Sequence, residues 1–239
     1  HIVLGQDMLK PRDGAEKDEG ELTGGKRLIR HLYERYHHFA DVVVADALYL
    51  NAPFIQTVQE CKMNVVIRLK DERRHIFKDA ESLFHTEGEK EGFKKGRITV
   101  KVWDLSGFEL EGMSGRFRVL KYEEYHPGEK ETRRMWVVTD LEYTDDETIW
   151  TMMHRRWDIE LNGFHQLKTY YHVNHCYAHA ATENIFLLNI LAFNIRELYL
   201  YRRKKTYKES GISRREITKR LDDELLVNDY KKLLYVDDG

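Results

Sequence analysis

The stretch 42-VVVAD-46 decides the fold class of this 239-residue chain. A short continuous apolar run of this kind is typical of a strand that is buried on both faces. A helical segment at residues 53–61 and a second apolar run, 64-NVVIRL-69, follow it along the chain. A strand, a helix and a strand at this spacing form a βαβ unit, in which the two strands are parallel. The sequence therefore predicts an α/β fold.

Around this unit the chain divides into four parts. We expect a core formed by residues 1–69 and 135–203. A β-rich insertion at residues 70–134 separates the two parts of this core, and a charged tail follows at residues 204–239. The insertion is predicted because its sequence is charged, punctuated by glycine and alternates between polar and apolar residues. The core begins with a short strand at residues 1–4 and a helix at 21–36, and it resumes with a buried strand at 135–139 and two helical regions.

The composition excludes several classes of protein. Hydrophobic residues make up 41% of the chain and charged residues 33%, with a net charge of −2, which is typical of a globular protein. Two cysteines, Cys61 and Cys176, cannot build a disulfide framework, so we expect a reducing compartment such as the cytoplasm. The most apolar run, at residues 185–200, is interrupted by asparagines and charged residues, which indicates a buried helix and no membrane span.

Asp46 and Glu160 are the candidate functional carboxylates. Asp46 stands at the carboxyl end of a predicted strand, where ligands bind in open α/β sheets, although a turn residue is the alternative. Glu160 lies on a long helix that is predicted to begin at a capping box, residues 144–147. A helical periodicity places Glu160 on the apolar side of that helix, with Ile149, Met153, Phe164 and Leu167. A carboxylate there needs a partner, and either an ion pair with Arg156 or a metal shared with Asp46 provides one.

Three further motifs have ordinary structural alternatives. The segment 20-GELTGGK-26 has the spacing of a phosphate-binding loop, but Arg27 replaces the Ser or Thr, so the segment indicates a helix start. A helical face predicted near residue 172 would carry potential zinc ligands, at His172, His175, Cys176 and His179. Four ligands from one helix do not easily close a tetrahedron, so packing is favoured. The basic segment 201–220 is either a solvated helical tail or a phosphate-contacting surface.

Two blocks of the sequence together resemble a known family. The segment 155-RRWDIELNGFHQLK-168, which follows a strand ending at Thr139, is similar to the catalytic helix of DDE-type insertion-sequence transposases. Within that family it resembles the group with a Tyr-x-x-Arg-x-x-x-Glu-x6-Lys signature. Residues 42–49 resemble the second catalytic Asp block of the same group, and Gly20-Glu21-Leu22 before a helix also fits. The resemblance extends over residues 1–203.

This resemblance implies a fold, a reaction and partners. The fold is a ribonuclease-H-like mixed sheet flanked by helices, with a β-rich insertion before the catalytic Glu. The reaction is cut-and-paste transposition of double-stranded DNA, in which a homodimer pairs the transposon ends and joins them to a target. Three carboxylates hold two Mg²⁺ (or Mn²⁺) ions that activate water and then a DNA 3′-hydroxyl. We expect a nucleoid-associated protein of the bacterial or archaeal cytoplasm, with no membrane partner.

The resemblance also assigns residues to these roles. Asp46 corresponds to the second catalytic carboxylate and Glu160 to the third, and both are metal ligands. Arg156 matches the signature Arg, which is expected to contact DNA near the scissile phosphate, and Arg155 is a further DNA-binding candidate. Lys168 is the candidate for the signature Lys, although it follows Glu160 by eight residues and not by seven.

Two other departures concern the remaining signature positions. Met153 stands where the signature has Tyr. The first catalytic Asp should end the first strand of the fold, yet only residues 1–4 read as a strand before the first helix, and Asp7 is a poor substitute. Because the sequence begins with His1, we expect a fragment that lacks the first Asp and the N-terminal strands and is inactive alone. A related nuclease without strand transfer and an inactive DNA-binding remnant are the alternative functions.

Overall fold

The chain divides into two compact units. The computed structural model describes all residues except 10–18, 71–73, 176–178, 204, 206–210 and 226–239. The first unit comprises Leu4–His165, and the second comprises His1–Val3 with Gln166–Gly239. Each unit is described by itself below. The domain boundaries expected at residues 69, 134 and 203 stay predictions.

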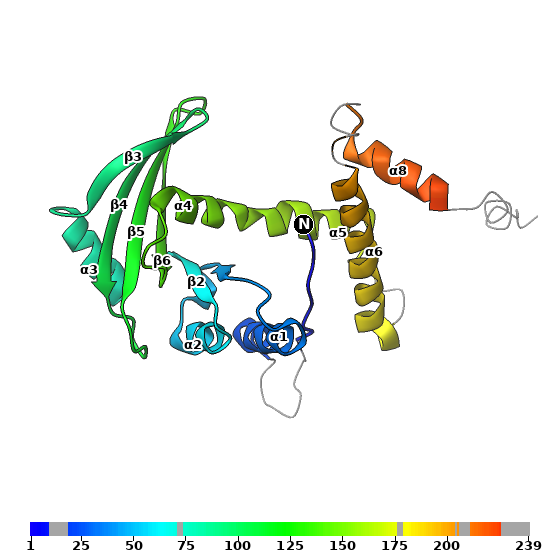
Figure 1. Ribbon diagram of the computed structural model, residues 1–239, viewed down its shortest axis with the longest axis horizontal. Helices are drawn as coiled ribbons and strands as arrows, with labels where there is room; N and C mark the ends of the chain where they lie inside the picture. Colours follow the sequence, from blue (N-terminus) through cyan, green and yellow to red (C-terminus); the bar gives the residue numbers. More distant parts are fainter. Residues whose placement is uncertain (10–18, 71–73, 176–178, 204, 206–210, 226–239) are drawn as a thin grey trace, which may run out of the picture. The chain divides into compact units, whose positions relative to one another are not determined.

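A six-stranded mixed sheet forms the centre of the first unit (Figure 1). Its order is β1-β2-β6-β5-β4-β3. The strands are β1 (Val42–Ala45), β2 (Asn64–Leu69), β3 (Glu89–Lys95), β4 (Ile98–Phe108), β5 (Phe117–His126) and β6 (Glu131–Thr139). β1 and β2 are parallel, with Val42 opposite Asn64, and all other neighbours are antiparallel. The predicted parallel pair and the buried strand at 135–139 are therefore confirmed.

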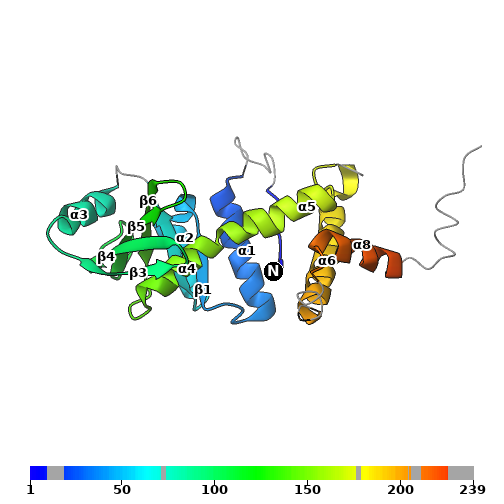
Figure 2. The same ribbon diagram turned by 90° about the horizontal axis from the view of Figure 1, so that it is seen from above.

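Helices cover both faces of this sheet. On one face, α1 (Glu21–Tyr36), α2 (Ala52–Glu60) and α3 (His75–Phe84) pack against a large apolar cluster. On the other face, α4 (Asp146–Arg155) packs against Val66, Val137 and Leu120. Figure 2 shows α2 and α3 on one side of the sheet and the start of α4 on the other. The predicted helices at 21–36 and 53–61 are confirmed, whereas α3 is a helix within the segment predicted to be β-rich.

Local side chains explain where these helices begin. The Asn51 side chain accepts a hydrogen bond from the Phe54 amide at 3.0 Å and caps α2. The Asp145 side chain accepts one from the Thr148 amide at 2.8 Å and caps α4 one residue after the Thr144 cap that the sequence pattern indicated. Gly20 is the N-cap of α1, as expected for a helix start and not for a phosphate-binding loop.

The chain is helical through residues 155–168 as predicted, apart from a turn at Arg156, but it is not a regular α-helix. α4 ends at Arg155, a π-helical turn follows at Ile159–Phe164, and α5 (His165–Tyr170) comes next. In the π turn the His165 amide donates a hydrogen bond to the carbonyl of Glu160, five residues earlier in the chain. The periodicity of about 100° per residue is therefore not kept through the π segment that contains Glu160. Phe164 is exposed, contrary to expectation.

Two predictions on the second unit are also wrong. Residues 1–3 form no strand; instead the Asn194 side chain pairs with the Val3 backbone, accepting at 2.9 Å and donating at 2.8 Å. The helical region expected from residue 172 begins only at α6 (Thr182–Arg202). His172 has a positive φ of 49° and lies outside any helix, so the predicted histidine face is not formed.

The second unit also contains a short turn before α6 and a helix after it. His179 begins a 3-10 turn at His179–Ala181, and Cys176 lies outside the described residues. A last helix, α8 (Arg214–Leu225), follows α6. No helix in the described part of the chain has the length and apolar character needed to cross a bilayer.

Candidate active site

Asp46 occupies the end of β1, as the sequence predicted. Its side chain accepts a hydrogen bond from the Ala47 amide at 2.8 Å and caps the short 3-10 turn Ala47–Tyr49. The Lys70 ammonium, directly after β2, lies 3.5 Å from the same carboxylate. The Asp46 side chain is 40% exposed. Its carboxylate therefore stands at the carboxyl ends of the parallel pair and is open to solvent.

The surroundings of Asp46 favour its ionised form. Partial burial raises the pKa of this carboxyl group. The hydrogen bond from Ala47 and the positive charges of Arg156 and Lys70 outweigh that effect, so the pKa lies below its ordinary value. Asp46 is thus a carboxylate that already attracts cations in the folded protein.

Arg156, directly after α4, connects the second candidate carboxylate to this region. Its guanidinium Nη1 lies 3.1 Å from Glu160 Oε1, and its charge also acts on Asp46. The Arg156 side chain is only 11% exposed, whereas the Glu160 side chain is 44% exposed. The expectation that Glu160 faces the core is therefore wrong, and the local ion pair is present. That ion pair includes the same cation that influences Asp46.

Two basic residues near Asp46, Lys70 and Arg68, were not expected from the sequence. Ala45 pairs with Ile67, so Arg68 follows in register beside Asp46. Strand alternation places Arg68 on the same face as Val66, which is the face that α4 covers. The Arg68 Nε atom is buried and has no hydrogen-bond partner among the residues that the structure describes. The only sequence signal was a charged end, Arg68-Leu69-Lys70, on an otherwise apolar strand.

A pocket of about 250 Å³ lies around the end of β2 and the middle of β6. It is lined by Arg68, Leu69, Lys70, Phe77, Glu81, Lys121, Arg134 and Trp136. The Lys121 ammonium lies 4.1 Å from the centre of the Trp103 ring and 3.0 Å from Glu123. Basic groups therefore predominate in the lining of this pocket, next to the Lys70 that pairs with Asp46.

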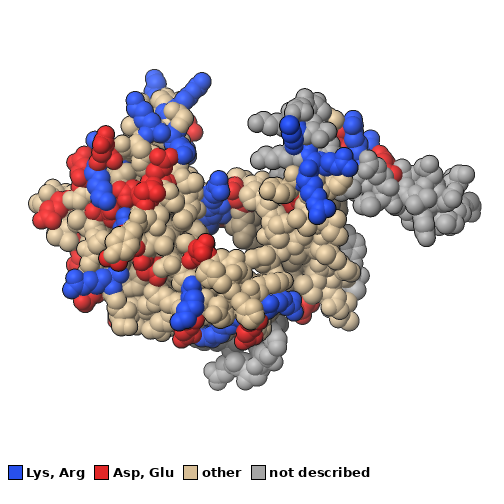
Figure 3. All heavy atoms as spheres, viewed as in Figure 1, with Lys and Arg blue, Asp and Glu red and all other residues tan. Residues whose placement is uncertain are grey.

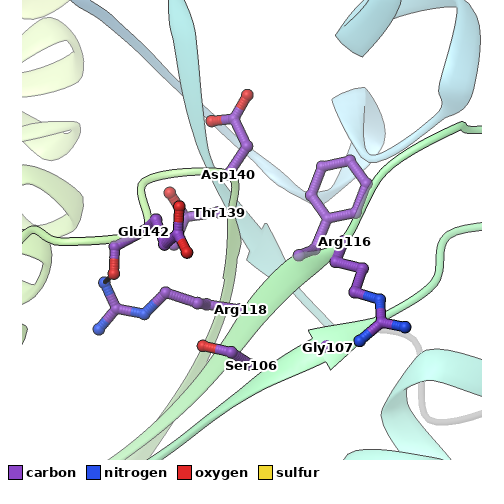
Figure 4. Close-up of a pocket in the computed structure, with 8 residues that line it drawn as sticks. Ser106, Gly107, Arg116, Arg118, Thr139, Asp140 and Glu142 are labelled. Carbon is purple, nitrogen blue, oxygen red and sulfur yellow. Dashed lines mark hydrogen bonds between the residues drawn. The ribbon is translucent and has the colours of Figure 1, made fainter.

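A larger pocket, of about 460 Å³, lies at the other end of the sheet (Figure 4). Thr139 and Asp140 at the end of β6, Glu142, and Ser106 of β4 contribute to it. Asp140 accepts hydrogen bonds from the Val65 amide and the Gln59 side chain, both at 2.8 Å. Because Thr139 is paired with Val66, this pocket lies away from the strand end that bears Asp46.

Other predicted residues have separate surroundings. Arg155 and Lys168 are both exposed, and Lys168 belongs to the second unit. Asp7 makes a bidentate ion pair with Arg27, with a distance of 2.7 Å from Nε to Oδ2, so its carboxylate is already engaged. Met153, at the position of the signature Tyr, is buried against the sheet.

The charge distribution offers no single continuous basic surface on the visible face. Figure 3 shows acidic and basic side chains interspersed over the sheet of the first unit, with basic groups projecting at its top end. In the described residues no group of three or more His, Cys, Asp or Glu side chains could hold a metal ion. Asp46 and Glu160 are nevertheless oxygen donors of the type that Mg²⁺ and Mn²⁺ prefer, and both are accessible.

The mixed sheet, with helices on both faces and an accessible carboxylate at the end of β1, defines a ribonuclease-H-like α/β protein. The family model for the transposase DDE domain matches residues 13–195, so the chain belongs to this family of transposases. A search of curated proteins gives no significant match.

Proposed function

We propose that this chain forms part of the catalytic domain of a DNA transposase, which cleaves phosphodiester bonds at transposon ends and joins the ends to target DNA. Asp46 and Glu160 act as its catalytic carboxylates. The observation that carries this proposal is the position of Arg156, whose guanidinium binds Glu160 and whose charge acts on Asp46. Membership of the DDE transposase family supports DNA as the substrate.

We propose Mg²⁺ or Mn²⁺ as the cofactor, with two ions in the complete site. Asp46 and Glu160 would hold the ions through carboxylate oxygens. When bound, such ions polarise the phosphodiester and generate a nucleophile at neutral pH. Arg156 binds the scissile phosphate in this proposal, because its guanidinium pairs with Glu160, its charge acts on Asp46, and a guanidinium is a strong phosphate ligand.

A third carboxylate completes this site, on a strand that pairs with the free edge of β1. Among the described strands, β1 pairs with β2 alone. Val42, Val43 and Val44 are only partly buried, although runs of valine are ordinarily covered on both faces. An open edge of this kind accepts a further strand, and a parallel one would end beside Asp46. The chain alone is therefore expected to be inactive.

Arg155 and Lys168 are proposed as contacts to the DNA backbone. Both side chains are exposed and long enough to reach phosphates. Lys168 follows Glu160 by one residue more than the signature does, and the π turn at Ile159–Phe164 lies within this interval. A π turn takes up more residues than an α-helical turn, which accounts for the additional residue. A homodimer on paired transposon ends is part of the same proposal.

The test is Mg²⁺-dependent nicking of transposon-end DNA by the protein extended with its upstream coding sequence. Asp46→Ala and Glu160→Ala should each reduce the nicking rate by about 10³-fold or more, as loss of a catalytic group does. The matched control is Glu142→Ala, which removes an exposed carboxylate at the opposite end of the sheet and should leave the rate unchanged. Full nicking by both site variants would refute the assignment.

The products distinguish the alternative functions. Ends joined covalently to a target plasmid indicate a transposase, whereas nicked ends without joining indicate a nuclease of the same fold. Binding of end DNA with neither product, in the extended protein, would indicate a DNA-binding remnant.

A further inference from the structure

Glu124 on β5 is a buried carboxylate outside the proposed catalytic site. Its side chain is 5% exposed. One oxygen, Oε1, accepts the Trp150 indole N–H at 2.8 Å and faces His154 Nε2 at 2.7 Å. The other oxygen, Oε2, faces His126 Nε2 at 3.3 Å. Trp150 and His154 both belong to α4, one helical turn apart, so a single carboxylate binds the helix at two points.

This arrangement restricts α4 more than apolar packing does. Ile149 and Met153 bury the helix against the sheet, but apolar contacts are not directional and permit small rotations. Hydrogen bonds depend steeply on distance and angle. Two of them on one oxygen therefore fix both the rotation of α4 about its axis and its position along the sheet. Loss of these partners would leave a buried charge without hydrogen bonds, which is energetically costly.

The aromatic neighbours support the same restriction. The Trp150 and His154 rings lie 4.0 Å apart, and the Phe93 ring meets Trp150 edge-on at 5.6 Å. Other interactions hold the first turn of α4: the Tyr122 hydroxyl donates to the Asp146 carbonyl at 2.8 Å, and Lys95 pairs with Glu147 at 2.6 Å. Glu124 is thus the polar anchor of the later turns of the helix, where Arg156 follows.

We propose that Glu124 is a positioning residue, which sets the rotation of α4 through Trp150 and His154 and thereby directs Arg156 toward Asp46 and the DNA phosphate. His154 lies two residues before Arg156, and each residue of rotation along a helix changes direction by about 100°. A small rotation at His154 therefore displaces the guanidinium. This inference rests on the proposed role of Arg156 in DNA binding.

The chain offers a matched pair of histidines to test this. His154→Gln removes a bond between Glu124 and α4, whereas His126→Gln removes a bond to the same carboxylate from within β5. With hydrogen–deuterium exchange of the present chain, we expect exchange at residues 150–160 to rise by about tenfold in His154→Gln and Glu124→Gln. His126→Gln should leave it unchanged, as should exchange in α1 in all variants. Equal effects of the two histidine variants would overturn the proposal.

Binding of a fluorescein-labelled DNA duplex at low salt provides the second readout. Glu124→Gln should weaken binding by about threefold in the parent chain and have no effect in an Arg156→Ala background, because coupled residues are not additive. A purely structural role would weaken binding equally in both backgrounds and would overturn the proposal. If Glu124→Gln does not fold, Trp150→Phe replaces it in both measurements.

The two proposals fail in different ways. If Arg156→Ala leaves DNA binding unchanged while exchange at residues 150–160 still rises in His154→Gln, the proposed role of Arg156 fails and the anchor stands only as a structural one. If Arg156→Ala weakens binding but His154→Gln changes neither readout, Glu124 is not a positioning residue.

Discussion

How completely an arginine's hydrogen-bonding groups are paired within the protein differs between the two ends of α4. At its start, Arg118 pairs with Asp104 at 2.8 Å and with Asp146 at 3.1 Å, and its side chain is 7% exposed. The same guanidinium donates to the carbonyls of the loop before the helix, at Leu141, Glu142 and Thr144. Just after the last residue of α4, Arg156 forms an ion pair with Glu160, and its buried Nε has no hydrogen-bond partner among the described residues.

This difference separates a structural cluster from a candidate functional one. Around Arg118 the hydrogen-bonding groups find partners within the protein, which is what a buried charge requires. Around Arg156 the carboxylates are accessible, and within the described part of the chain the Arg156 Nε has no acceptor. Carboxylates that remain accessible can bind a ligand, whereas buried and fully paired ones cannot.

The largest effect should come from breaking the cluster at the start of α4. Arg118→Met leaves Asp104 buried without its main cation and three carbonyls without a donor, and should reduce the free energy of unfolding by about 3–5 kcal/mol. The measurement is urea denaturation followed by tryptophan fluorescence. Arg116→Met, an exposed arginine two residues earlier, is the control and should change stability by less than about 0.5 kcal/mol. Similar losses in both variants would mean that Arg118 is not an anchor.

A smaller effect, dependent on pH, should come from Glu124. Burial raises the pKa of Glu124, but the hydrogen bonds from His154, Trp150 and His126 and the charge of His154 outweigh it and lower the pKa below 4.5. The stabilisation by the ionised form is therefore present above pH 4.5 and is lost as the pH falls through the folded-state pKa. Glu124→Gln should cost about 2 kcal/mol at neutral pH and clearly less in acid. A loss independent of pH, in denaturation at both pH values, would contradict this account.

Tyr122 tests a single contact at the start of the helix. Tyr122→Phe removes the hydroxyl that donates to the Asp146 carbonyl and keeps the ring in place. The free energy of unfolding should fall by about 1 kcal/mol, the usual value of one neutral hydrogen bond. Thermal unfolding detects such a change, and an unchanged midpoint would show that water replaces the hydroxyl.

The smallest effect on stability should come from the other end of α4. Glu160→Gln removes a half-exposed ion pair with Arg156 and should change the free energy of unfolding by less than about 0.5 kcal/mol. The same substitution should abolish nicking by the extended protein. A large loss of stability in Glu160→Gln would show that this end is as structural as the first, and would remove the contrast between them.

The sequence was sufficient for much of the core because burial leaves a pattern. The valine runs at residues 42–45 and 64–69 and the helix at 21–36 follow from apolar periodicity, and Asp46 was found because it ends such a run. α3 was not found, since its apolar residues lie within a segment whose charge and glycine content resembled antiparallel strands.

The finer geometry of the site depends on features that leave no such pattern. A π turn changes the number of residues per turn without changing composition, so the direction of Glu160 was misjudged. Arg68 comes beside Asp46 only through the register between β1 and β2, which are separated by a helix in the sequence. The sequence is compatible with the ion pair of Arg156 and Glu160, but the effect of the Arg156 charge on Asp46 depends on the fold.

Trp157 gives the site an optical reporter of its own. Trp157 is about half exposed, and the Arg156 guanidinium lies 4.9 Å from the ring centre. A cation stacked on an indole interacts with its π electrons, so displacement of Arg156 changes the electrostatic environment of this chromophore. Binding of metal or DNA at the proposed site should therefore change the emission of Trp157, one of the four tryptophans of the chain.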